Sequence, residues 1–99
     1  MTNTVANTIL QQLGGSRFLV MTGAKNLIGS DDSLTMKIGS NAAGVTHVRI
    51  TLTKFDTYRM EFLKVRGTKI TTLFGTSDLV YAEDLRRIFT AHTGLDTSL

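Results

Sequence analysis

Residues 46–74 read THVRITLTKFDTYRMEFLKVRGTKITTLF, and this stretch decides the fold. Apolar and polar side chains alternate through it with a period of two, which is typical of strands that bury one face. Two short breaks, at residues 54–56 and 66–68, contain the turn-forming residues Asp56 and Gly67. The stretch therefore predicts three consecutive antiparallel strands, whose buried phase carries Val48, Ile50, Leu52, Tyr58, Met60, Phe62, Ile70, Thr72 and Phe74.

The alternation breaks after Phe62, because Leu63 and Val65 fall on what had been the polar face. A β-bulge explains such a break, and so does a helix or a partner that covers this end of the outer face. Leu63 and Val65 therefore form a candidate apolar interface, and one form that we expect it to take is a homodimer.

The rest of the chain predicts two helices and two further strands. Apolar residues have helical spacing over residues 2–13 and 81–93, and Gly14 and Gly94 follow these segments as stop signals. The apolar run at residues 18–21 predicts a buried strand over residues 17–22, and residues 33–38 alternate as a strand. Residues 22–32 are expected to be a connection. The order α-β-β-β-β-β-α predicts one α+β domain over residues 1–99, with a five-stranded antiparallel sheet and both terminal helices packed on one face.

The composition excludes several classes of protein. A hydrophobic fraction of 41% over 99 residues indicates one folded domain. The absence of cysteine excludes disulfides, thiolate metal sites and cysteine nucleophiles. We find no signal peptide at the start and no apolar run long enough to cross a bilayer, so we expect no membrane partner.

The sequence predicts no catalytic residue, no metal site and no cofactor. The two histidines, His47 and His92, fall on different elements without the spacing of metal ligands. No serine or threonine pairs locally with a histidine and an acid, as nucleophilic catalysis requires. Residues 22–26 bring glycine and Lys25 together as a phosphate-binding loop does, but they lack the P-loop spacing. An enzyme is therefore the weakest of our hypotheses.

The formal net charge of +3, from 11 basic and 8 acidic residues, fits an anionic partner. If neighbouring strands pair in chain order, four basic side chains share the outer face of the sheet, and two more lie on the second helix. Such a face is either ordinary solvated surface or a platform for a phosphate backbone or an acidic protein. The aromatic residues of the sheet fall on the buried phase, which argues against base stacking. The candidate nucleic-acid-binding residues are Lys37, Arg49, Arg59, Lys69, Arg86 and Arg87.

Three segments, ILQQLGGSRFLVMTGAKNLIG, VRITLTKFDTYRMEFLKVRGTKITTLF and HTGLDTSL, resemble a set of small uncharacterised proteins encoded by phages and other mobile elements. The resemblance covers nearly the whole chain and transfers no site residue. It implies a small accessory protein in the cytoplasm of the host cell, acting on nucleic acid or on a host factor such as a defence complex. Our first hypothesis is a nucleic-acid-binding module, and our second is a protein-interaction module.

Overall fold

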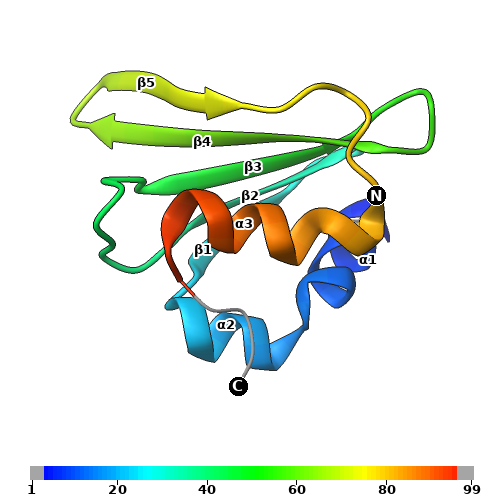
Figure 1. Cartoon of the computed structure of the whole chain (residues 1–99), viewed down its shortest axis with the longest axis horizontal. Helices are drawn as coiled ribbons and strands as arrows, with labels where there is room; N and C mark the ends of the chain where they lie inside the picture. Colours follow the sequence, from blue (N-terminus) through cyan, green and yellow to red (C-terminus); the bar gives the residue numbers. More distant parts are fainter. Residues whose placement is uncertain (1–3, 96–99) are drawn as a thin grey trace.

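The five strands of the sheet pair in chain order, β1–β2–β3–β4–β5, and every pair is antiparallel. The computed structural model describes residues 4–95, and Figure 1 shows the sheet on one side of the protein with the helices on the other. The turns β1–β2 and β3–β4 lie at one end of the sheet, and the loop β2–β3 and the turn β4–β5 lie at the opposite end. The strands are β1 (Lys25–Gly29), β2 (Ser33–Lys37), β3 (His47–Leu52), β4 (Tyr58–Arg66) and β5 (Lys69–Gly75).

All the helices cover the same face of the sheet, which we call the inner face (Figure 1). They are α1 (Thr4–Leu13), α2 (Ser16–Thr22), a 3₁₀ turn η1 (Ala82–Asp84) and α3 (Leu85–Thr93). The rings of Phe18 and Phe89 meet edge to face at 5.1 Å and join α2 to α3. The side chains that are completely excluded from solvent come from both layers and include Ile9, Leu13, Phe18, Met36, Val48, Ile50, Met60, Phe62, Leu85 and Phe89.

The predicted α+β class and the five-stranded antiparallel sheet are confirmed. The alternation that predicted β3 and β4 is confirmed through Phe62, because Val48, Ile50, Tyr58, Met60 and Phe62 are all buried. The second predicted helix ends as expected at Gly94, which takes a left-handed φ of 76°. Residues 2 and 3 of the first predicted helix and residues 96–99 of the predicted tail lie outside the described residues.

The prediction of a strand over residues 17–22 is wrong, since this segment forms the helix α2. Only Phe18 and Thr22 of the helix are buried, at a spacing of four, while Val20 is 82% exposed. Thr22 donates its hydroxyl hydrogen to the carbonyl oxygen of Phe18, and Gly23 ends the helix in the left-handed region with a φ of 67°. A short apolar run does not distinguish a strand from a helix, and here packing against α3 decides for the helix.

The sheet keeps five strands because β1 forms inside the segment that was predicted to be a connection. Lys25 is the Cα partner of Lys37, and Ile28 is the partner of Thr35, so β1 contains one extra residue between these pairs. Asn26 lies within this irregularity and has a φ of 54°. The strand is an exposed edge with little intrinsic strand propensity, and its pairing with β2 supplies the structure that its own sequence does not favour.

The alternation break after Phe62 does not come from a bulge in β4, because β4 pairs with β3 without a shift and Leu63 lies on the outer face opposite His47. The β-bulge near this point lies in β5 instead. The pairs on either side of the shift are Phe62 with Phe74 and Leu63 with Thr72, so Leu73 is the extra residue. The prediction that Ile70, Thr72 and Phe74 share one buried face is therefore wrong. Phe74 lies on the inner face beside Phe62, whereas Ile70 and Thr72 lie on the outer face, and every residue of β5 is exposed.

The loop between β2 and β3 is held by the side chain of Asn41. Its amide nitrogen donates to the carbonyl oxygens of Gly39 and Val45, and its side-chain oxygen accepts the Val45 N–H at 3.1 Å. Gly39 also donates its N–H to the carbonyl oxygen of Thr22 at 2.8 Å, which ties the loop to the end of α2. This loop lies at the same end of the sheet as the β4–β5 turn.

Candidate functional site

Three basic side chains lie in a row across the outer face, and we call them the basic rung. Lys25 in β1 is the Cα partner of Lys37 in β2, which in turn is the partner of His47 in β3. Cross-strand partners lie on the same face of a sheet, so the three side chains are direct neighbours. The next residue in the row, Leu63 of β4, is apolar and buried. The rung therefore collects positive charge, and no carboxylate of residues 4–95 lies beside it.

His47 is oriented by its neighbour in the chain. Its Nδ1 lies 2.8 Å from the Thr46 hydroxyl oxygen, which also accepts the N–H of Val65 at 2.8 Å and lies 3.3 Å from the carbonyl oxygen of Leu63. Partial burial, and then the nearby charge of Lys37, lower the pKa of His47 below its ordinary value. These two effects favour the neutral imidazole when no anion is present.

Two of the predicted phosphate-binding arginines are engaged in ion pairs. Arg49 donates from Nε to Glu61 at 2.9 Å and from Nη2 at 3.3 Å, and hydrogen bonding to Glu61 is the main reason that the pKa of Arg49 is raised. Arg59 lies on the same face, and its Nη1 is 3.3 Å from the carboxylate of Asp78. Both arginines lie on the outer face as predicted, but each has a carboxylate as its nearest partner.

Lys69 does not share a face with the other predicted residues of the sheet. Because Leu73 is an extra residue, Lys69 pairs with Arg66, and Thr71 pairs with Lys64, on the same face as Phe62 and Phe74. The prediction that placed Lys69 beside Arg49 on the outer face is therefore wrong.

The end of the β4–β5 hairpin instead forms a second basic cluster. Lys64, Arg66 and Lys69, which we call the basic hairpin, line a surface hollow of about 220 Å³ together with Thr71. None of the three makes an ion pair within residues 4–95.

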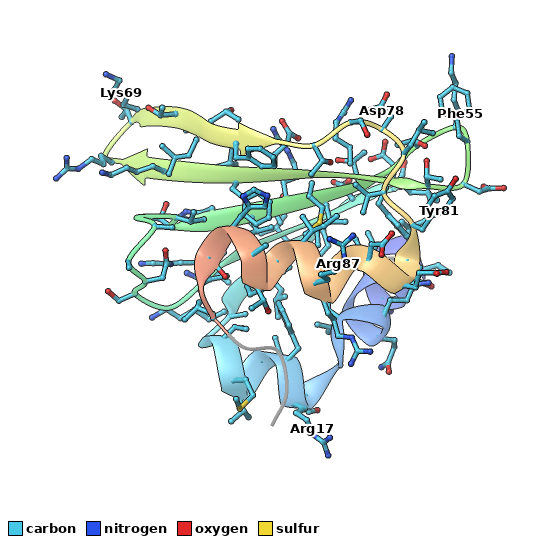
Figure 2. All side chains as sticks on the ribbon, viewed as in Figure 1. Arg17, Phe55, Lys69, Asp78, Tyr81 and Arg87 are labelled. Carbon is cyan, nitrogen blue, oxygen red and sulfur yellow. The ribbon has the colours of Figure 1, made fainter. Side chains whose placement is uncertain are left out.

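Arg86 and Arg87 lie on α3, in the helix layer, and do not join the basic residues of the outer face. Both are exposed, and Nη2 of Arg87 lies 3.2 Å from the carboxylate of Asp84 one turn earlier. Figure 2 shows Arg87 below the sheet and Lys69 at the far end of the hairpin. The six predicted cations are thus distributed over three surfaces.

The charges of the sheet are segregated along the strand direction. Lys25, Lys37, Lys64, Arg66 and Lys69, from four strands, lie at the end formed by the β4–β5 turn, and we call this the basic end. Within residues 4–95, no Asp or Glu lies between the cross-strand pair of Arg49 and Glu61 and this end of the sheet. Figure 2 shows Lys69 there and Asp78 toward the opposite end. That opposite, acidic end carries six of the eight acidic residues of the chain, namely Asp31, Asp32, Asp56, Asp78, Glu83 and Asp84.

The predicted interface of Leu63 and Val65 offers little apolar surface. Leu63 is only 5% exposed, and it lies between its partners His47 and Thr72. Val65 is half-buried, and its partner Ile70 is 66% exposed. The apolar side chain that this region presents to solvent is therefore that of Ile70 on the edge strand.

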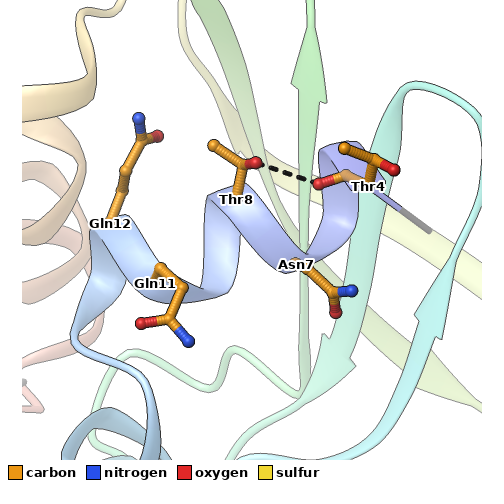
Figure 3. Close-up of a pocket in the computed structure, with 5 residues that line it drawn as sticks. All are labelled: Thr4, Asn7, Thr8, Gln11 and Gln12. Atoms are coloured by element: carbon orange, nitrogen blue, oxygen red, sulfur yellow. Dashed lines mark hydrogen bonds between the residues drawn. The ribbon is translucent and has the colours of Figure 1, made fainter.

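The described residues contain no cluster of three or more metal-ligating side chains. His92 stacks on Phe74 with ring centroids 3.8 Å apart, and it is on the inner face, away from His47. The hollow shown in Figure 3, of about 430 Å³, is lined by Thr4, Asn7, Thr8, Gln11 and Gln12, which are neutral polar residues of α1. Thr8 donates its hydroxyl hydrogen to the carbonyl oxygen of Thr4 there. Because these five lining residues carry no titratable side chain, they supply no acid–base pair.

No family model matches the chain, and no curated protein or solved structure is similar to it. The resemblance to small phage proteins therefore stays a prediction from the sequence. No helix among residues 4–95 is long and apolar enough to cross a membrane.

Sequence reasoning missed four residues of these clusters, namely Lys25, His47, Lys64 and Arg66. Lys25 was missed because β1 was expected to be a connection. Lys64 and Arg66 flank the predicted turn at Gly67 together with Lys69, and this spacing of basic residues around a two-residue turn is a signal that could have indicated the basic hairpin.

Proposed function

We propose that the protein is a non-enzymatic module that binds the phosphate backbone of a nucleic acid at its basic end. The observation that carries this proposal is the segregation of charge along the strands. The five Lys and Arg residues of the basic end make no ion pair within residues 4–95, so they are available to an external anion. Lysine and arginine side chains that neutralise phosphates release counterions, which drives binding to nucleic acids.

This mode of binding reads the backbone rather than the bases. The cationic positions lie on the inner face of the β4–β5 hairpin and on the outer face of β1 and β2, an arrangement suited to a curved or grooved polyanion. The aromatic residue nearest to the basic hairpin on its own face, Phe74, already stacks on His92. Base stacking would need a free aromatic surface, so we expect little sequence preference.

The experiment that tests this proposal is a fluorescence-anisotropy titration of labelled duplex and single-stranded DNA and RNA. If three to five phosphates are contacted, the logarithm of the affinity should fall against the logarithm of salt with a slope of roughly −2.7 to −4.5 on duplex DNA. Absence of binding to all four ligands at low salt would contradict the proposal.

The alternative is a protein-interaction module, and the observation that favours it is the edge strand β5. All seven residues of β5 are exposed, including Ile70 at 66%, and edge strands can pair with a strand from another chain. The partner would be a second copy or, as the resemblance to phage proteins implies, a host complex. Binding at such an edge should change little with salt, and sedimentation at high concentration would distinguish a homodimer from a monomer.

A further inference from the structure

The basic rung has an unusual electrostatic arrangement for neighbouring strands. Lys25, Lys37 and His47 occupy successive partner positions on three strands, and like charges that face one another across strands, as those of Lys25 and Lys37 do, destabilise a sheet. The row ends at the buried apolar side chain of Leu63, which cannot compensate the charge. An anion that bridges the rung would remove this repulsion.

The hydrogen bonds around His47 leave its second ring nitrogen, Nε2, without a partner among residues 4–95. Nδ1 faces the Thr46 hydroxyl, and that hydroxyl can donate to the carbonyl oxygen of Leu63. In this arrangement a protonated His47 donates from Nδ1 to Thr46 and keeps the N–H at Nε2 for another acceptor. The positions of Thr46 and Leu63 therefore accommodate the protonated imidazole.

The other charged groups near His47 come from β1, β2, β3 and β4. Lys37 is its direct partner, and Lys25 lies one strand further along the rung. Arg49, two residues along β3, is hydrogen-bonded to Glu61 of β4, so this pair adds no net charge. Besides the partial burial of His47, the charges that act on its protonation are therefore that of Lys37, its direct neighbour, and that of any anion held at the rung.

We propose that the basic rung is a proton-coupled phosphate site, in which Lys25 and Lys37 hold a phosphate group that also accepts a hydrogen bond from Nε2 of protonated His47. This proposal rests on the proposed function, because the backbone of a nucleic acid is one source of the phosphate; free inorganic phosphate is the other. Binding of phosphate favours protonation of His47, and protonation favours binding, since the two are linked.

The chain offers an internal control for this site. It contains two histidines, His47 in the rung and His92 on the inner face against Phe74. Their imidazole resonances can be followed separately by NMR as the pH is changed. We therefore propose pH titrations in sodium chloride alone, with a short DNA duplex, and with inorganic phosphate at the same ionic strength.

The duplex should raise the pKa of His47 and leave the imidazole chemical shifts of His92 unperturbed. It should also bind about threefold to tenfold more tightly near pH 5.5 than near pH 7.5, because His47 then carries a positive charge. A duplex that binds without changing the pKa of His47 would overturn the phosphate site and leave the proposed function standing. A rise with inorganic phosphate but without any binding of duplex would support the site and overturn the proposed function. No rise with either anion would overturn the site, and the anisotropy titration would judge the function separately.

Two variants sharpen the test. Lys37→Gln should raise the pKa of His47 in sodium chloride, because a nearby positive charge is gone, and should abolish the further rise on adding duplex. Lys54→Gln removes one positive charge at the acidic end instead. It should leave the titration of His47 unchanged, both in sodium chloride alone and with the duplex. Equal behaviour of these two variants would overturn the assignment of the site to the rung.

Discussion

The guanidinium of Arg49 lies 2.9 Å from the carboxylate of Glu61 across β3 and β4, and two hydrogen bonds join them. This pair occupies the middle of the outer face, where sequence reasoning had placed a cation free to bind phosphate. The exposed fractions of the two side chains are 44% and 22%, so the pair adds about 0–1 kcal/mol to stability. Its larger effect is to neutralise Arg49.

Glu61→Gln should therefore improve binding to nucleic acid. The substitution frees Arg49 and removes a negative charge beside the basic end, so we expect the affinity at low salt to rise roughly threefold and the salt dependence to steepen by about one phosphate contact.

Arg49→Ala should weaken binding less than Lys69→Ala, because Arg49 is paired with Glu61 whereas Lys69 makes no ion pair within residues 4–95. Anisotropy titrations at several salt concentrations measure all three variants. A larger loss for Arg49→Ala than for Lys69→Ala would show that the ion pair opens on binding.

Phe89→Ala should destabilise the whole domain. Phe89 is fully buried and packs edge to face on Phe18, so its removal leaves a cavity between α2 and α3. Replacing a buried phenylalanine by alanine costs about 3–5 kcal/mol. Urea unfolding measures the loss, and Phe55→Ala is the control, because Phe55 is 58% exposed. Similar midpoints for the two variants would contradict the packing of α2 against α3.

Gly39→Ala should also be destabilising, for a reason that lies in the backbone. A Cβ atom at residue 39 would lie 2.9 Å from the carbonyl oxygen of Thr22, which accepts the N–H of Gly39 itself. Moving the two segments apart should cost about 1–3 kcal/mol. Gly75→Ala is the matched control, because a Cβ atom there meets nothing within 4 Å. Thermal unfolding of both variants tests the contact, which would be contradicted by equal stabilities.

The stability of the unliganded domain should increase with pH because of His47. Its folded-state pKa lies below the ordinary value of about 6.5, so the unfolded chain binds more protons at mildly acidic pH. The contribution of His47 to the free energy of unfolding is therefore complete above the pKa that it has in the unfolded chain, and it is lost as the pH falls from there through the lower, folded-state pKa. Urea unfolding near pH 5.5 and near pH 7.5, in buffer without phosphate, should show a smaller difference for His47→Gln than for the native chain. Identical differences would count against this shift.

The sequence predicts β3 and β4 well because their alternation is regular and their buried side chains are large. It fails at α2, where four consecutive apolar residues fit either a strand or a helix, and only the contact of Phe18 with Phe89 decides. It fails at β1 because a strand made of KNLIG depends on pairing with β2 rather than on its own propensity.

The candidate site could be predicted in part. Arg49 and Arg59 lie on the outer face as expected, but their acidic partners come from cross-strand register and from a distant loop, which local pattern does not give. Lys69 was placed on the wrong face because β5 contains one extra residue, Leu73. As a result, residues 69–72 face the opposite side of the sheet from the one that simple alternation with Phe74 predicts. The segregation of charge between the two ends depends on the order in which the strands pair, which local pattern does not determine.

The most direct test of the basic end compares two triple variants of equal charge. One removes Lys64, Arg66 and Lys69 from the basic hairpin by substitution to Ala, and the other removes Lys54, Arg86 and Arg87 in the same way. All six residues are exposed or partly exposed, so circular dichroism and urea unfolding should show that both variants fold. The account predicts that the first variant loses at least about tenfold in affinity for duplex DNA at low salt. The magnitude of its salt slope should fall by about two to three. The affinity of the second variant should change by less than about twofold. Equal losses in the two variants would show that net charge alone governs binding and would contradict a phosphate-binding site at the basic end.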